Sequence, residues 1–279
     1  MYDIIEKIGN STIQHGKYND RIYLMKLDPK NVEDIVEEVT KLASKKEYSK
    51  IFAKIPENSL QTFIKAGFDE EAFIPEFYHG KEKAVFLAKY LSSDRKSVDT
   101  ETRLVINKNI NIAKSKAGRG VDKNLPNGYK LKQIPESDID QLASLYKVVF
   151  PTYPFPIHDP EYLKEVMATH VDFFGVYQGS KLIAASSAEM DLKSKNAEMT
   201  DFATDPDYLG HGLALFLLDL MDKYMMDKKF PTVYTIARSM SPGMNITFAK
   251  LGYQFTGTLI NNTNISGSIE SMNVWYKGL

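Results

Sequence analysis

The clearest change in hydrophobic pattern along the chain lies in residues 198–218, EMTDFATDPDYLGHGLALFLL. Its first residues alternate between apolar and polar side chains, as a half-buried strand does. A turn signal, DPD, follows, and Gly210 and Gly212 then lead into an apolar run at helical spacing. The pattern therefore predicts a strand, a glycine turn and a helix in direct succession.

The rest of the chain divides into two blocks of strands and helices. The first block is predicted to contain strands at residues 21–27, 49–55, 71–77 and 84–91 and helices at 30–46 and 58–66. The second has strands at 129–133, 172–178 and 181–190 and helices at 137–148 and 160–168, and it then enters the stretch described above. Residues 92–124 are polar and basic. We therefore expect an N-terminal domain over residues 1–91, a linker over 92–124 and a second domain over 125–279.

A weak internal repeat links the two blocks. Residues 50–91 and 233–279 both read as a strand, a turn with proline, a short helix ending in F-x-K-x-G-[FY], a strand, a turn with glycine and a closing strand. The first copy has Asp28-Pro29 in place of the glycine turn, and proline has no N–H to offer a phosphate. We therefore expect the N-terminal copy to be structural or to supply a wall of the binding cleft.

Composition narrows the function classes. The 279 residues include no cysteine, which excludes disulfides, thiolate metal sites and cysteine nucleophiles. The net charge of −1 provides no overall field for nucleic acid or an anionic membrane. No apolar run reaches the roughly 20 residues that span a bilayer, and the five histidines show no metal-ligand spacing. We expect a cytoplasmic protein without a metal.

The glycine turn has two interpretations. A helix that starts at such a turn directs unpaired N–H groups and the positive end of its dipole at one point, which suits a phosphate or pyrophosphate. Gly212 has no Cβ to obstruct the ligand. Alternatively, the turn only reverses the chain.

The order of elements, and the segment LGHGLA at residues 209–214, resemble the GNAT acetyltransferases and their acetyl-CoA motif [Q/R]-x-x-G-x-[G/A]. Gly212 and Ala214 match, whereas Leu209 replaces the usual Arg or Gln. The resemblance implies an α/β (α+β) fold: a mixed, mostly antiparallel central sheet flanked by helices, here preceded by a smaller degenerate GNAT-like α/β domain. It also implies acetyl-CoA contacts from Phe202, Ala203, Thr204, Leu209, Gly210, His211, Gly212, Leu213, Ala214, Asn245 and Phe248.

A narrower likeness covers nearly the whole chain. Segments such as FIPEFYHGKEKAVFLAKYLSSDR, VFPTYPFPIHDPEYL and NNTNISGSIESMNVWYK are similar to those of the beta-lysine N-acetyltransferases. This likeness implies that the acceptor is the ε-amine of β-lysine and that the product is a compatible solute, Nε-acetyl-β-lysine. Acetylation of another small amine or of a peptide amine stays open, as does a non-catalytic acyl-CoA-binding module.

The reaction requires a base, because an ε-amine has a reference pKa of ~10.4 and is charged at neutral pH. Glu198 is the first candidate, since its place resembles that of the catalytic glutamate in some GNAT enzymes. Asp201 is the second, on the opposite strand face if alternation holds; for either, a surface or ion-paired carboxylate is the alternative. Phe248 stands where many members have a proton-donating tyrosine. Either water, Tyr253 or Tyr234 protonates the thiolate, or the thiolate, with a reference pKa of ~8.5, leaves without a dedicated acid.

The acceptor would need groups for its carboxylate, its second amine and its aliphatic chain. Arg238 suits the carboxylate, and Glu189 or Asp201 suits the ammonium. Tyr153 and Phe155, on the proline-rich loop at residues 150–157, would cover the chain, although core filling is an equal alternative. We expect no nucleic acid or membrane partner, and a homodimer remains open.

Overall fold

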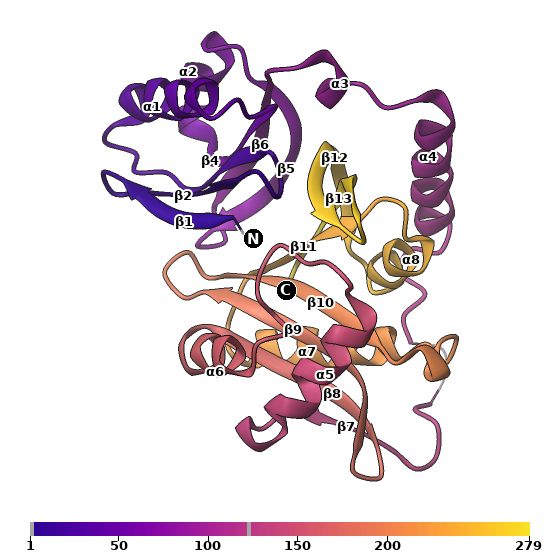
Figure 1. Cartoon of the computed structure of the whole chain (residues 1–279). Coiled ribbons are helices and arrows are strands. Elements are labelled where there is room, and N and C mark those ends of the chain that lie inside the picture. The colour runs from indigo at the N-terminus through magenta and orange to yellow at the C-terminus, as the bar shows by residue number, and fades with distance from the viewer. Residues whose placement is uncertain (1–2, 122–123) are drawn as a thin grey trace.

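The computed structural model describes residues 3–121 and 124–279 (Figure 1). Residues 122–123 of the predicted linker lie outside the described part. The N-terminal sheet has the strand order β1-β2-β3-β4-β6-β5. Its strands are β1 (Ile4–Ile8), β2 (Ser11–Gly16), β3 (Arg21–Lys26), β4 (Lys50–Pro56), β5 (Asp69–Tyr78) and β6 (Glu82–Tyr90), and its helices are α1 (Val32–Lys45) and α2 (Leu60–Lys65).

The C-terminal sheet has the order β12-β13-β11-β10-β9-β8-β7. Its strands are β7 (Tyr129–Gln133), β8 (Val171–Gln178), β9 (Lys181–Asp191), β10 (Asn196–Thr204), β11 (Thr232–Arg238), β12 (Gln254–Ile265) and β13 (Ser268–Gly278). Its helices are α5 (Ile139–Val149), α6 (Pro160–Thr169), α7 (Leu213–Asp227) and α8 (Pro242–Lys250).

The two sheets share one topology. In each, a helix connects a parallel strand pair, β3–α1–β4 in the first and β10–α7–β11 in the second. A short helix and an antiparallel hairpin follow, β5–β6 and β12–β13 respectively. All other neighbouring strands in both sheets are antiparallel. The predicted fold, a mixed and mostly antiparallel sheet preceded by a smaller copy of itself, is confirmed.

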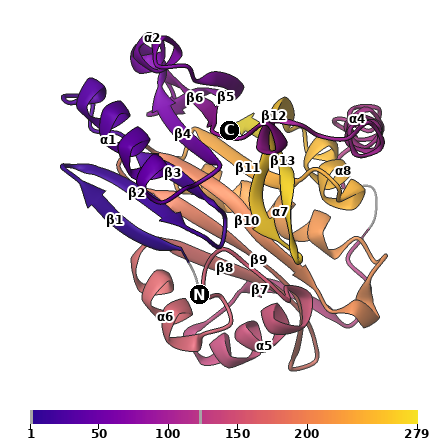
Figure 2. The same cartoon turned by 45° about the horizontal axis from the view of Figure 1, so that its top comes forward.

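Apart from the exposed edge strand β1, both faces of the N-terminal sheet are covered by other elements. One face packs against the apolar side of α1, where Ile35, Val36 and Val39 recur at helical spacing. The other face packs against the C-terminal sheet (Figures 1 and 2). That shared core contains Phe52, Phe77 and Phe86 from the first sheet and Tyr234, Leu259 and Val274 from the second. The N-terminal sheet therefore covers part of one face of the C-terminal sheet.

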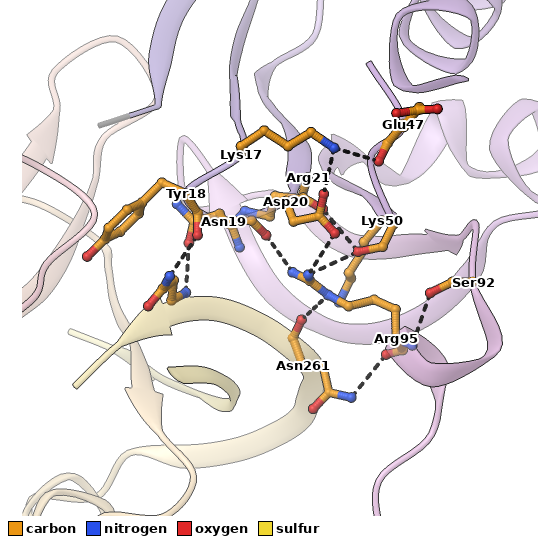
Figure 3. A network of polar contacts seen from close by, with 12 residues as sticks. Lys17, Tyr18, Asn19, Asp20, Arg21, Glu47, Lys50, Ser92, Arg95 and Asn261 are labelled. Atoms are coloured by element: carbon orange, nitrogen blue, oxygen red, sulfur yellow. Dashed lines mark hydrogen bonds and ion pairs between the residues drawn. The ribbon is translucent and has the colours of Figure 1, made fainter. Parts of the chain in front are cut away.

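Buried polar contacts hold the two sheets in one position (Figure 3). The guanidinium of Arg95, on α3 (Ser93–Lys96), donates to the carbonyl of Asn261 at 2.7 Å, and the Asn261 amide donates back to the Arg95 carbonyl at 3.1 Å. The fully buried Lys50 ammonium donates to Glu71 at 2.9 Å and to the Ile260 carbonyl at 2.7 Å. Because charged groups that lose water need such partners, any relative sliding of the sheets is costly.

Much of the predicted linker is an ordered helix, α4 (Thr100–Lys114), which lies beside α8 (Figures 1 and 2). Asn109 donates its amide to the Ser239 carbonyl at 3.0 Å, and the Gly118 N–H donates to Ala249 at 3.0 Å. Within the described ranges, no helix is both long and apolar enough to cross a membrane.

Candidate active site

The site forms where strands β10 and β11 separate. They pair in parallel only over residues 196–198 and 232–234, although β10 continues to Thr204 and β11 to Arg238. Glu198 and Tyr234 form the last pair. Beyond them, the facing edges of the two strands carry backbone groups with no ladder partner, and these can bind an extended ligand chain between the strands.

Glu198 has the properties of a general base. Tyr234 is its registered partner on β11. Burial raises the pKa of Glu198 to about 7, and the carboxylate of Glu189, directly opposite on β9, adds to the rise. A carboxylate with a near-neutral pKa is available in its basic form at pH 7 and also holds a proton well.

Asp201 lies on the same side of the sheet as Glu198, so the expectation of opposite faces was wrong. A bulge interrupts the β9–β10 register between Thr200 and Ala203, and Asp201 sits in it with a positive φ of 55°. The Ser187 hydroxyl donates to Asp201 at 2.6 Å, and the Tyr153 hydroxyl donates to its other oxygen. Burial raises the pKa of Asp201. These bonds suit a residue that positions its neighbours.

Glu189 remains open to a ligand. Its side chain is 46% exposed, and the His170 imidazole lies 4.0 Å from its carboxylate. Partial removal from water raises the pKa of Glu189, while His170 opposes the rise. Glu189 and Glu198 therefore place two carboxylates side by side, in a position suited to amines.

The N-terminal sheet contributes a residue to the site, Lys54, that the sequence analysis did not predict. The Lys54 ammonium, from β4, lies 5.3 Å from the ring centre of Phe77 and 5.8 Å from that of Tyr234. Burial acts to lower the pKa of Lys54, but the acidic groups around it outweigh burial and raise it. These groups are Tyr23, Tyr78, Glu198 and Glu189. A single lysine inside the apolar strand segment IFAKI was the signal available in the sequence.

The glycine turn has the geometry of an anion site. Gly210 and Gly212 have φ values of 84° and 73°, and Gly212 caps α7 without a side-chain hydrogen bond. In the described part of the chain, no acceptor is bonded to the N–H groups of residues 210–214. A Cβ built on either glycine meets nothing within 4 Å, so the space beside both glycines is open. The turn thus fits a pyrophosphate.

The other residues predicted to contact the coenzyme fall into two groups. Phe202, Ala203 and Thr204 continue β10 past the separation, so they lie between Glu198 and the glycine turn in the chain. Leu209 is 65% exposed, His211 is exposed and bonds the Tyr129 hydroxyl at 3.1 Å, Leu213 is buried, and Ala214 is half-buried. Their contacts with acetyl-CoA remain predictions.

The expected contact between the Asn245 side chain and acetyl-CoA is not supported by the structure. This side chain is fully buried and uses its hydrogen bonds within the protein. The amide donates to Arg238 and Ser241 carbonyls at 3.0 and 2.7 Å, and the oxygen accepts from Asn273 and Trp275 at 2.8 Å each. Asn245 therefore fixes the start of α8, and its side chain is not free for the coenzyme.

Tyr253 and Arg238, predicted as the proton donor and the carboxylate ligand, already bond other side chains of the protein. The Tyr253 hydroxyl is buried and donates to Asp222 at 2.7 Å, in the core beneath α7 and α8, so it is badly placed as a proton donor. Arg238 forms a bidentate ion pair with Glu270, at 3.0 and 2.6 Å, so its guanidinium is not free for a substrate carboxylate. Sequence spacing could not reveal either partner, because both come from other elements.

Phe248 and Phe155 both pack against hydrophobic side chains of the protein. Phe248 is 1% exposed and contacts the Phe202 ring edge-on, with 5.5 Å between centres. Phe155 packs against the shared core, whereas Tyr153 is a buried member of that core and bonds Asp201. The described residues hold no cluster of three or more His, Cys, Asp or Glu side chains that could bind a metal.

Several known proteins are similar to this chain in sequence. Residues 139–253 match the Acetyltransferase (GNAT) family. The chain is 42% identical over 99% of both chains to the beta-lysine N(6)-acetyltransferase of Methanococcus maripaludis. It is 33% identical to that of Methanosarcina mazei, covering 88% of this chain and 97% of the relative, and 30% identical to N-acetyltransferase YodP of Bacillus subtilis, covering 96% of both. This chain belongs to the acetyltransferase (GNAT) family.

Proposed function

We propose that this protein is an acetyl-CoA-dependent N-acetyltransferase that acetylates the ε-amine (N6) of β-lysine. The observation that carries the proposal is the position of Glu198, a carboxylate with a pKa of about 7 where β10 and β11 separate. On one side of it the strand leads to the glycine turn, and on the other stand Glu189 and the wall from the N-terminal sheet. The relatives named for this reaction match along nearly the whole chain.

Glu198 prepares the acceptor. The ε-ammonium has a reference pKa of ~10.4 and has no lone pair to attack with until it loses a proton. Glu198 takes that proton, directly or through a water, at the point where the two strands separate. Glu189, exposed beside it, holds the second ammonium of the acceptor.

The glycine turn and the free edge of β10 position the donor. Acetyl-CoA supplies the acetyl group as a thioester, whose pyrophosphate fits the free N–H groups of residues 210–214. As the amine nitrogen bonds to the carbonyl carbon, the carbon–sulfur bond breaks, the thiolate leaves, and the nitrogen gives its remaining extra proton to water or to the thiolate. Phe248 has no proton to give, but a thiol with a reference pKa of ~8.5 is a tolerable leaving group as the anion.

The test is CoA thiol release from acetyl-CoA with β-lysine, with α-lysine and without an acceptor, followed by mass-spectrometric location of the acetyl group. We expect acceptor-dependent release, fastest with β-lysine, and a product acetylated at N6. Tight CoA binding without acceptor-dependent release would instead support a non-catalytic acyl-CoA-binding module. Faster release with another amine would move the proposal to that acceptor. Because acetyl-CoA is the donor, we place the reaction in the cytoplasm.

A further inference from the structure

Lys54 is an ammonium without an acceptor. In the described ranges, its Nζ has no hydrogen bond and no carboxylate within 4.0 Å, and its contacts are the rings of Phe77 and Tyr234. By contrast, the buried Lys50 on the same strand has Glu71 at 2.9 Å. A charged group that is largely removed from water without a partner is costly to keep. Such a group therefore points to a ligand that supplies the partner.

The charges around Lys54 define what that ligand carries. Glu198 and Glu189 on the C-terminal sheet provide two acidic groups, and Lys54 on the facing sheet provides one cation. Tyr234 is near both charges, since its ring lies 5.8 Å from the Lys54 ammonium and it is the registered partner of Glu198 on β11. This arrangement complements a molecule with two amines and one carboxylate. The arginine expected to bind the carboxylate, Arg238, is paired with Glu270 instead.

We propose that Lys54 binds the carboxylate of the acceptor, so that the N-terminal sheet selects amino acids over simple diamines. This inference rests on the proposed function and assigns a role to the degenerate copy. Lys54 attracts an acceptor that carries a carboxylate and repels one that carries only positive charges. Selection is thus made by a residue outside the sheet that carries Glu198.

The position of Lys54 depends on the docking of the two sheets. The Thr232 hydroxyl, at the start of β11, donates to the Glu76 carbonyl at 2.6 Å, and the Asn196 amide, at the start of β10, donates to the Phe77 carbonyl at 3.2 Å. Both bonds tie β5 to the strands that carry Glu198 and Tyr234. They fix how the N-terminal sheet sits against these two strands, and a specificity residue requires such a fixed position.

The test compares β-lysine with 1,4-diaminopentane, which keeps both amines but has a methyl group in place of the carboxymethyl group. Kinetics are measured at about pH 9, where Glu198 is deprotonated, so that any effect of Lys54 on the charge state of Glu198 is removed. The variants are Lys54→Met, which keeps the apolar stem, and Lys54→Arg, which keeps the charge. Lys89→Met is the control, since Lys89 lies on β6 over the Phe68 ring, which belongs to the α1-facing core.

We expect Lys54→Met to lower kcat/KM for β-lysine about 10- to 100-fold, mainly through KM, as for loss of a charged hydrogen bond. Its activity with 1,4-diaminopentane should be unchanged or higher, Lys54→Arg should keep most of the preference, and Lys89→Met should match wild type. Equal losses with both acceptors, or an unchanged preference in Lys54→Met, would overturn the role of Lys54. Failure of the wild-type enzyme to acetylate β-lysine would overturn the proposed function, and with it this inference.

Discussion

Glu198 and Tyr234 face each other as the last registered pair of β10 and β11. The two strands separate directly after this pair. The carboxylate is therefore fixed at the entrance to the opening, next to the place where a thioester between the strands would meet an amine.

Replacing Glu198 by glutamine should remove the base. For the wild-type enzyme we expect kcat/KM to rise with pH around an apparent pKa of about 7, because the deprotonated carboxylate accepts the proton. Glu198→Gln should lower kcat/KM by about 10²- to 10⁴-fold at pH 8, and the kcat/KM of this variant should no longer rise with pH around 7. Glu37→Gln, an exposed carboxyl on α1, is the control. A full-rate Glu198→Gln enzyme with the same pH profile would remove Glu198 from the mechanism.

The same substitution should stabilise the fold at high pH. The pKa of Glu198 in the folded chain is raised from 4.5 to about 7, so folding favours the protonated form, and stability is lost as pH rises through about 7. Glutamine carries no charge at any pH. With allowance for partial solvent access, we expect Glu198→Gln to raise the free energy of unfolding by about 1–2 kcal/mol at pH 8 and to change it little at pH 4. Urea titrations at both pH values measure this, and an equal effect at both would contradict the raised pKa.

Gly212→Ala should weaken acetyl-CoA binding. The residue has a φ of 73°, where an alanine costs about 1–2 kcal/mol, and a shift of the turn moves the N–H donors. Gly179→Ala is the matched control. Gly179 lies in the β8–β9 hairpin with a φ of 60°, and an added Cβ there also meets nothing within 4 Å. Both variants should lose similar stability, but only Gly212→Ala should raise the KM for acetyl-CoA, by about 10-fold. Similar KM values in the two variants would count against a pyrophosphate site at the turn.

Tyr253→Phe should affect stability and leave catalysis intact. The Tyr253 hydroxyl donates to Asp222, which also binds Lys277 at 2.7 Å. Losing this buried bond should lower the free energy of unfolding by about 1–3 kcal/mol. We expect kcat and its pH profile to stay within a factor of two of wild type. A drop in kcat of tenfold or more with normal acetyl-CoA binding would restore Tyr253 as the proton donor.

The glycine turn and the strand before it could be predicted because their signals are local. Gly210 and Gly212 are needed for two positive φ values within three residues, and the helix that follows shows its period directly. The repeat was also readable, since both copies keep the order of strand, helix and hairpin. Asp201 was misplaced because a bulge adds one residue to β10, and strict alternation cannot foresee it.

The sequence by itself determined the order of elements, the sheet type and the segment that carries Glu198, since these follow from periodicity, turn residues and family resemblance. Only the tertiary structure decided which side chains are free. Arg238, Asn245 and Tyr253 have partners on other elements, whereas Lys54 has none among the described residues and lies against Tyr234 of the other sheet. The physical reason is that binding capacity depends on which hydrogen bonds and charges remain unsatisfied after the sheets pack, and contacts between distant segments settle that.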